Sequence, residues 1–170
     1  MIVKTLYLVR HAKSSWANLS GGDHARPLNE RGRANAPAMA ERLRLRGVKL
    51  DRLITSSAQR AKETGRFLAK GLRVESPQVE EEDELYGADV ADWIRLIQKL
   101  NESWQTVMMI GHNPTLTELA HEFGRTDILN VPTCGVLECQ FEGEFWGNFG
   151  DQLRELKVRF DFPKNTGEPF

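Results

Sequence analysis

Three short motifs hold the side chains of this chain that could do chemistry. Arg10 and His11 follow the apolar run TLYLV, Arg60 lies in TSSAQR, and His112 lies in IGHNP. The arginine guanidinium binds phosphate through paired hydrogen bonds, and neutral imidazole is a nucleophile near pH 7. These residue types therefore predict a pocket that binds a phosphoryl group and can accept it on a histidine.

His11 is the predicted nucleophile. If one of its ring nitrogens donates to a backbone carbonyl, the other presents a lone pair that can attack phosphorus, and water then releases phosphate. Arg10, Arg60 and a protonated His112 would stabilise the charge on the transferring oxygens. This chemistry needs no metal, and the sequence has no obvious cluster of metal ligands. We therefore expect no cofactor.

Apolar runs and helix-capping signals predict the elements that must position these motifs. Predicted strands occupy residues 5–11, 51–57, 105–112, 135–141 and 153–162, and predicted helices occupy residues 30–46, 58–70, 89–100 and 114–123. Asn29, Ser57 and Asn113 are the expected helix caps, with Pro114 at the first helical position after Asn113. Pro37 falls inside the first helix and should kink it or move its start.

The alternation of strands and helices favours an α/β fold with three layers. In such a fold a largely parallel central sheet carries helices on both faces. Ligands bind at the carboxyl ends of its strands. If the motif-bearing strands are parallel, one sheet edge gathers the predicted site residues Arg10, His11, Ser56, Arg60 and His112. Residues 12–29 and the acidic run at 80–84 are expected to be loops.

Composition limits the class of protein. The chain has 170 residues, of which 40% are hydrophobic and 28% charged, which is typical of one soluble globular domain. We assign residues 1–162 to this domain and 163–170 to a loose tail. A net charge of −1 lacks the basic excess of a nucleic-acid-binding protein. The apolar runs are too short to span a membrane.

Two cysteines bear on the compartment. Cys134 and Cys139 should face opposite sides of a strand, so we expect buried, unpaired thiols in a reducing environment. The first residues lack the pattern of a secretory signal. These observations predict a cytoplasmic protein, and since nothing in the sequence demands an oligomer, we expect a monomer.

Three stretches, in this order and spacing, carry a family resemblance: LYLVRHAKS, ITSSAQRAKET and IGHNP. Together they resemble the histidine phosphatase superfamily, which has the phosphoglycerate-mutase-like fold. The short chain and the stretch RPLNERGRANA are most similar to the small phosphohistidine phosphatases within it. The resemblance covers about residues 3–162. It implies a nucleophile at His11, phosphate-binding arginines at Arg10 and Arg60, and the second family histidine at His112.

The resemblance also implies a proton donor, because many members use a glutamate that falls here on Glu84 in EDELYG. The alternative is that Glu84 is one more carboxylate of an acidic loop. Imidazole is a weaker base than an alkoxide, so a phosphohistidine phosphatase can work without a strong acid. Many members have glycine after the nucleophile, where this chain has Ala12, and the backbone could lie slightly closer to the phosphate.

Further side chains are candidates for binding substrate. Ser14 and Arg26, with Lys13, could line the mouth of the site from the long loop, and Asn113 follows the third motif. His24 and His121 carry no signal of function, and the four tryptophans are expected in the core or at its margin.

Three functions fit the motifs. The first is a metal-independent phosphatase that acts through a phosphohistidine intermediate, with phosphohistidine on a protein as its substrate. The second is a phosphatase or mutase of a small phosphometabolite, although the short stretch 61–111 leaves little chain to cover such a substrate. The third is a module that binds phosphate without turnover, against which the complete set of histidines and arginines argues.

Overall fold

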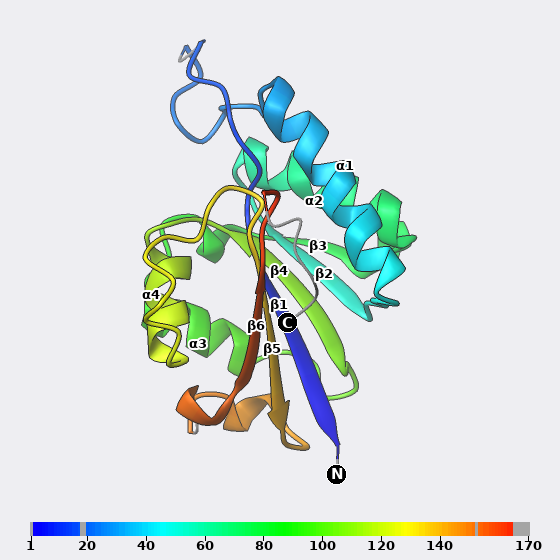
Figure 1. The fold of residues 1–170 in the computed structure, drawn as a ribbon, viewed down its shortest axis with the longest axis vertical. Coiled ribbons are helices and arrows are strands. Elements are labelled where there is room, and N and C mark those ends of the chain that lie inside the picture. The colour runs from blue at the N-terminus through cyan, green and yellow to red at the C-terminus, as the bar shows by residue number, and fades with distance from the viewer. Residues whose placement is uncertain (1, 18–19, 152, 165–170) are drawn as a thin grey trace.

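The computed structural model describes residues 2–17, 20–151 and 153–164. Along the chain the elements are β1 (Val3–Arg10), α1 (Glu30–Leu45), β2 (Arg52–Ser56), α2 (Gln59–Leu72), β3 (Val79–Glu82), α3 (Val90–Gln98), β4 (Thr106–Gly111), α4 (Thr115–Glu122), β5 (Val136–Glu142) and β6 (Lys157–Asp161) (Figure 1). Short 3-10 turns occupy Ser76–Gln78, Asp83–Leu85, Trp146–Asn148 and Leu153–Glu155.

Six strands form one sheet in the order β3-β2-β4-β1-β5-β6. Strands β1 to β4 pair in parallel, whereas β5 pairs antiparallel with β1 and β6 antiparallel with β5. The sheet is therefore largely parallel, as predicted. In the pairing of β1 with β4, Arg10 lies opposite Gly111, so the residues that follow these two strands emerge side by side.

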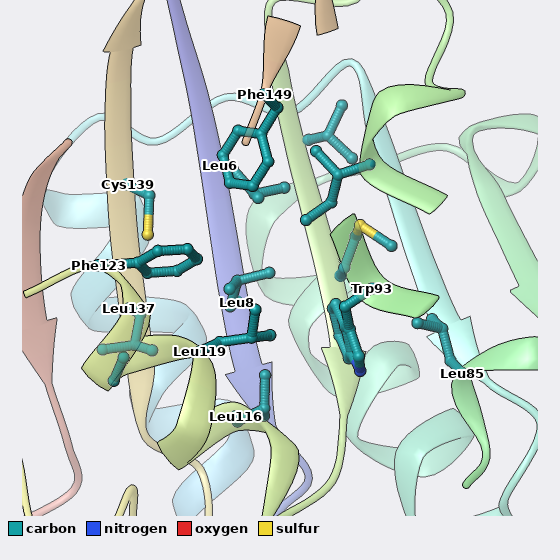
Figure 2. Packing of buried hydrophobic residues seen from close by; sticks show 14 of the residues in the cluster. Leu6, Leu8, Leu85, Trp93, Leu116, Leu119, Phe123, Leu137, Cys139 and Phe149 are labelled. Atoms are coloured by element: carbon teal, nitrogen blue, oxygen red, sulfur yellow. The ribbon is translucent and has the colours of Figure 1, made fainter. Parts of the chain in front are cut away.

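Helices cover both faces of the sheet, which confirms the three-layer α/β fold (Figure 1). Leu6 and Leu8 of β1 face the α3 and α4 side, where Figure 2 shows them with Trp93 and other buried side chains. Tyr7 and Val9 face the α1 and α2 side. This alternation is the two-residue period of a strand that is buried on both faces. Burial of each such leucine stabilises the fold by roughly 1.5–3 kcal/mol.

The start of α1 follows the predicted capping pattern. The Asn29 side chain accepts a hydrogen bond from the Gly32 amide at 2.9 Å. Pro37 neither ends the helix nor moves its start, because α1 is continuous from Glu30 to Leu45. Pro37 lies on the exposed face of α1, where water can reach the carbonyl that its missing N–H leaves without a helical donor.

Two predicted helix caps are wrong. Ala58, not Ser57, is the N-cap of α2, and no side chain caps that helix. Pro114 is the N-cap of α4, and the peptide bond before it is cis. The Asn113 amide instead donates to the Asn130 side chain and to the Val131 carbonyl, at 3.0 and 2.9 Å. In both places a tertiary contact competes successfully for a side chain that local sequence assigns to a cap.

The acidic run at 80–84 is not the predicted loop. Its first residues belong to β3, which pairs with β2 at the edge of the sheet, and the next form a 3-10 turn. An edge strand tolerates charge because one of its sides faces solvent. The last predicted strand is shorter than expected, since a 3-10 turn takes its start and β6 begins at Lys157.

Cys134 and Cys139 are buried and unpaired, as predicted, and pack on opposite faces of the sheet. Cys134 lies just before β5 rather than in it, with φ at 63°. Most of the predicted tail, residues 165–170, lies outside the described residues. Within the described part of the chain, no helix combines the length and apolar character needed to cross a lipid bilayer.

Candidate active site

The carboxyl ends of β1 and β4 bring the two predicted site histidines together. The His11 amide donates to the Gly111 carbonyl at 3.1 Å, which continues the β1–β4 pairing by one residue. The imidazole rings of His11 and His112 consequently lie 5.2 Å apart between centroids. A side chain on Gly111 would overlap the Trp93 ring of α3, so a glycine is required where the helix packs against this strand end.

His11 has the geometry of a nucleophile. Its Nδ1 lies 2.7 Å from the Ala12 carbonyl oxygen, so this nitrogen carries the proton and donates it. The lone pair of Nε2 is then available, and it accepts a hydrogen bond from Arg60 Nε at 3.3 Å. Burial lowers the pKa of His11 to about 3; the bond to Ala12 opposes this, and the nearby cationic groups add to it. His11 is therefore neutral near pH 7, as attack on phosphorus requires.

His112 is held by a buried serine. Its Nε2 lies 2.7 Å from Ser56 Oγ, and Ser56 also accepts from the Ala58 amide at 3.3 Å. Burial, together with the charge of Arg60, lowers the pKa of His112 to about 4. His112 is therefore neutral near pH 7 in this structure, whereas the sequence predicts a protonated His112 during phosphoryl transfer. A bound phosphate dianion would raise this pKa again.

Two arginines supply positive charge. Arg60 lies in the first turn of α2 and is buried beside His11. Arg10 ends β1 and donates through Nη1 to the Val131 carbonyl at 2.8 Å. In the described part of the chain, Arg10 Nε and His112 Nδ1 are buried without a hydrogen-bond partner. Buried polar atoms without partners are rare in folded proteins. Their place beside the two histidines is what an anion-binding site requires.

Backbone contacts fix the first motif against the helices. The Ala12 amide donates to Thr64 Oγ1 at 2.9 Å, and the Thr64 hydroxyl donates to the Arg60 carbonyl at 2.7 Å. Thr64 thereby ties the segment after β1 to the turn of α2 that carries Arg60. Gly32 of α1 lies directly against the Lys13 carbonyl, and any Cβ at this position would collide with it. The Ala12 amide is therefore already bonded and is not free to donate to a phosphate.

A second group of polar side chains contacts Arg60 and His112, and the sequence analysis did not identify it. Asp23 accepts hydrogen bonds from Arg60 Nη2 at 3.0 Å, Arg26 Nη1 at 2.8 Å and the Tyr86 hydroxyl at 2.8 Å. The Tyr86 ring stands edge-on to His112, with centroids 5.7 Å apart. His24, which carried no signal in the sequence, stands edge-on to Tyr86 at 4.7 Å.

The loop candidates are partly brought to the site. Ser14 and Arg26 are buried and bond to each other at 2.5 Å, and Arg26 stacks on the Trp16 ring. Arg26 reaches the site through Asp23. Asn113 is occupied by its contacts with residues 130–131 and by Thr117, whose hydroxyl donates to it at 3.1 Å.

Glu84 is not brought to the histidines. Its side chain is exposed, and its carboxylate contacts Arg95 of α3 at 3.3 Å. It lines a surface hollow together with the acidic residues of β3 and Leu96 of α3. Tyr86, two residues further along the chain, is the side chain of this segment that lies against His112.

The geometry can bind a tetrahedral oxyanion beside a neutral imidazole. His11 Nε2 faces the guanidinium of Arg60, and Arg10 and His112 each keep a buried nitrogen without a partner. Donors fixed in this way stabilise charge that develops on transferring oxygens. Among the described residues, no group of three or more histidine, cysteine, aspartate or glutamate side chains is arranged to hold a metal ion.

Comparisons with known proteins place these features in a family. A model of the histidine phosphatase superfamily (branch 1) matches residues 6–118. An uncharacterised chloroplastic protein of Arabidopsis thaliana is 29% identical over 154 residues, covering 85% of this chain and 70% of that protein. A 2,3-bisphosphoglycerate-dependent phosphoglycerate mutase of Mesorhizobium japonicum is 43% identical over 63 residues, covering 36% of this chain and 31% of the mutase.

A solved structure extends the likeness to most of the fold. The crystal structure of a candidate phosphohistidine phosphatase, SixA, from Agrobacterium tumefaciens matches with a TM-score of 0.73 and 29% identity, covering 80% of this chain and 90% of that chain. The family model spans more than half of this chain and includes the strand ends that carry His11 and His112. The chain belongs to the histidine phosphatase superfamily.

Proposed function

We propose that this protein is a phosphatase that carries the phosphoryl group on His11 during turnover, and that its substrate is phosphohistidine on another protein. The observation that carries this proposal is the state of His11: Nδ1 donates to the Ala12 carbonyl, and the neutral Nε2 faces Arg60. A lone pair held beside a phosphate-binding cation is the arrangement that nucleophilic phosphoryl transfer needs.

In the first step the Nε2 lone pair attacks phosphorus. The bond from phosphorus to the substrate nitrogen breaks, and its electron pair goes to that nitrogen. Nδ1 keeps its proton, and the Ala12 carbonyl stabilises the positive charge on the ring. Arg10, Arg60 and the free nitrogen of His112 bind the phosphoryl oxygens. In the second step water attacks phosphorus, the Nε2–phosphorus bond breaks, and phosphate is released.

The surroundings of the leaving group favour phosphohistidine over a phosphate ester. An alkoxide needs a proton as it leaves, whereas imidazole is a much weaker base. Glu84, the carboxyl expected to supply that proton, contacts Arg95 instead. The Asp23 carboxylate is held ionised: burial would raise its pKa, but hydrogen bonds from Arg26, Tyr86 and Arg60 keep that pKa far below its usual range. A strong acid for an ester is therefore missing from the described contacts.

The test is phosphate release in excess EDTA from a phosphohistidine peptide and from a simple alkyl phosphate. We expect fast release from the peptide and little from the ester. His11→Ala should lower turnover by about 10³-fold or more. His121→Ala is the matched control. His121 lies on α4 and bonds to the Ile128 carbonyl beyond that helix, so this variant should leave turnover unchanged.

Other outcomes would select another function. Equal or faster release from the ester would favour a phosphatase of small phosphometabolites, which the local identity to phosphoglycerate mutases also suggests. Release that is the same with and without His11 would contradict the proposed nucleophile. Binding of phosphate with no turnover of either substrate would indicate a phosphate-binding module.

A further inference from the structure

The donors that should bind phosphate are partly occupied by a residue of the chain itself. All three nitrogens of the Arg60 guanidinium have acceptors: Nε donates to His11, Nη1 to the Asp23 carbonyl at 2.7 Å, and Nη2 to the Asp23 carboxylate at 3.0 Å. Nε and Nη2 form the edge through which an arginine binds an oxyanion with two hydrogen bonds. One half of that edge therefore already holds an anion.

The Asp23 carboxylate has the contacts of a bound anion. Its Oδ2 accepts from Arg60 and from the Tyr86 hydroxyl, and its Oδ1 accepts from Arg26. Two arginine guanidinium groups are also the donors that typically bind a phosphoryl group. The carboxylate thus occupies donors that could otherwise bind part of a phosphate.

We propose that Asp23 is an affinity-determining residue that competes with the phosphoryl group for Arg60 and is displaced when phosphate or a phosphorylated substrate binds. The proposal deepens the proposed function, on which it rests for the identity of the displaced anion. A phosphate dianion and the Asp23 carboxylate cannot share Arg60 Nη2 without strong repulsion at this separation. One of them must leave the donor.

The position of Asp23 allows it to leave. Its side chain is 48% exposed, although the arginines it contacts are buried. It belongs to the segment between β1 and α1, directly after Gly22, whose φ is 76°. Rotation of the side chain toward solvent would free the arginines without moving the Asp23 carbonyl, which keeps its hydrogen bond to Arg60 Nη1.

The consequence for turnover concerns product release. A site with two free arginines would hold inorganic phosphate tightly, and release of product would then limit the rate. An internal carboxylate that returns to Arg60 lowers the affinity for phosphate and helps to expel it. The same competition raises the concentration of substrate needed for half-maximal rate.

The test is the dissociation constant of inorganic phosphate, measured by isothermal titration calorimetry on the whole protein. Asp23→Asn keeps the size of the side chain and removes its charge, and we expect it to bind phosphate about tenfold more tightly. Asp23→Glu keeps the charge and should stay near the original affinity. Asp151→Asn is the control, because it removes an equal charge from an exposed residue. Asp151 lies near Val3, at the end of β1 opposite to the end that carries the site. It should change the affinity by less than about twofold.

Weaker or unchanged phosphate binding by Asp23→Asn would overturn the proposal and make Asp23 a residue that merely holds Arg60 in place. A second variant gives an independent check, because Tyr86→Phe removes one donor from the carboxylate and should tighten phosphate binding by a smaller factor. The dissociation constant of inorganic phosphate is measured without any turnover, so this test does not depend on catalysis. A protein that fails to release phosphate from any substrate but still binds it more tightly after Asp23→Asn would refute the proposed function alone.

Discussion

The floor of the site and its rim are built in different ways. The floor consists of His11, His112 and Ser56 at strand ends, and the rim consists of Asp23, together with Tyr86, on connecting segments. Ser56 is fully buried and His11 is 7% exposed, whereas Tyr86 is 38% exposed. The floor is held by backbone and hydroxyl hydrogen bonds, and the rim by an ionic cluster. The sheet therefore fixes the two histidines, whereas the side chains around them are held by the connecting segments.

Arg60 joins the two regions, so its replacement should have the largest effect after that of His11. Arg60→Lys keeps the charge but cannot form a bidentate contact with an oxyanion. It also loses the hydrogen bonds to His11 and Asp23. We expect kcat/KM for the phosphohistidine peptide to fall by about 10²–10³-fold. Arg66→Lys, at an exposed position of the same helix, is the control and should leave kcat/KM unchanged. A similar loss in both variants would mean that the helix, not the contact, is responsible.

Acid should lower the free energy of unfolding, because the two histidines of the floor have lowered pKa values in the folded state. The pKa values of His11 and His112 are lowered to about 3 and about 4 in the folded state, against about 6.5 in the unfolded chain. The unfolded chain therefore binds two more protons between about pH 6 and pH 4, so the free energy of unfolding falls as pH falls. Each histidine contributes about 1.4 kcal/mol per pH unit across this window.

Urea unfolding between pH 7 and pH 4.5 measures this slope. His112→Asn should remove about half of it, and a slope that is unchanged in this variant would contradict the low pKa. Above about pH 5, Asp23 of the rim should add little to the slope, because its carboxyl is ionised there in both the folded and the unfolded chain.

Replacement of two neighbouring serines should distinguish the role of the floor from that of the rim. Ser56 bonds to His112 in the floor. Ser57 bonds at 2.9 Å to His24, whose ring packs edge-on against Tyr86 of the rim. Ser56→Ala should lower kcat by about tenfold, since it leaves His112 without the hydroxyl that orients it. Ser57→Ala should change KM by a smaller factor and leave kcat near its original value. Steady-state kinetics on the phosphohistidine peptide measures both constants, and the reverse pattern would contradict the division into floor and rim.

The smallest effect is expected at Glu84, which belongs to neither region. Its exposed carboxylate contacts Arg95 on the protein surface, where an ion pair contributes little to stability. Glu84→Gln should change kcat/KM for the phosphohistidine peptide by less than about twofold. A loss of tenfold or more, confined to alkyl phosphate, would restore Glu84 as a proton donor and require movement of the turn that carries it.

The floor could be predicted from sequence because it depends on local signals. Apolar runs mark β1, β2 and β4, and the parallel arrangement of their ends follows from the alternation with helices. The rim could not be predicted, since Asp23 and Tyr86 are 63 residues apart and meet only through the tertiary fold. Ser57 and Asn113 show the same limit, because distant partners take side chains that resemble helix caps.

Other differences have separate physical causes. The acidic run at 80–84 lacks the apolar alternation of a strand. Its first residues are extended because they pair with β2, a tertiary contact that the local sequence does not indicate. Pro37 is tolerated in α1 because it lies on the exposed face. The family motif predicts Glu84 at the site. The 3-10 turn at Asp83–Leu85 instead orients the Glu84 carboxylate toward Arg95 of α3.

The matched register of β1 and β4 limits how this chain can change in length. Arg10 lies opposite Gly111, and a histidine directly follows each of the two strands. Because side chains alternate between the faces of a sheet, insertion of a single residue into either strand would turn one histidine to the opposite face and separate the pair. Insertions and deletions compatible with the histidine pair are therefore confined to the connections, such as residues 73–78 between α2 and β3. Variation in loop length could alter the range of accepted substrates while the reaction stays the same.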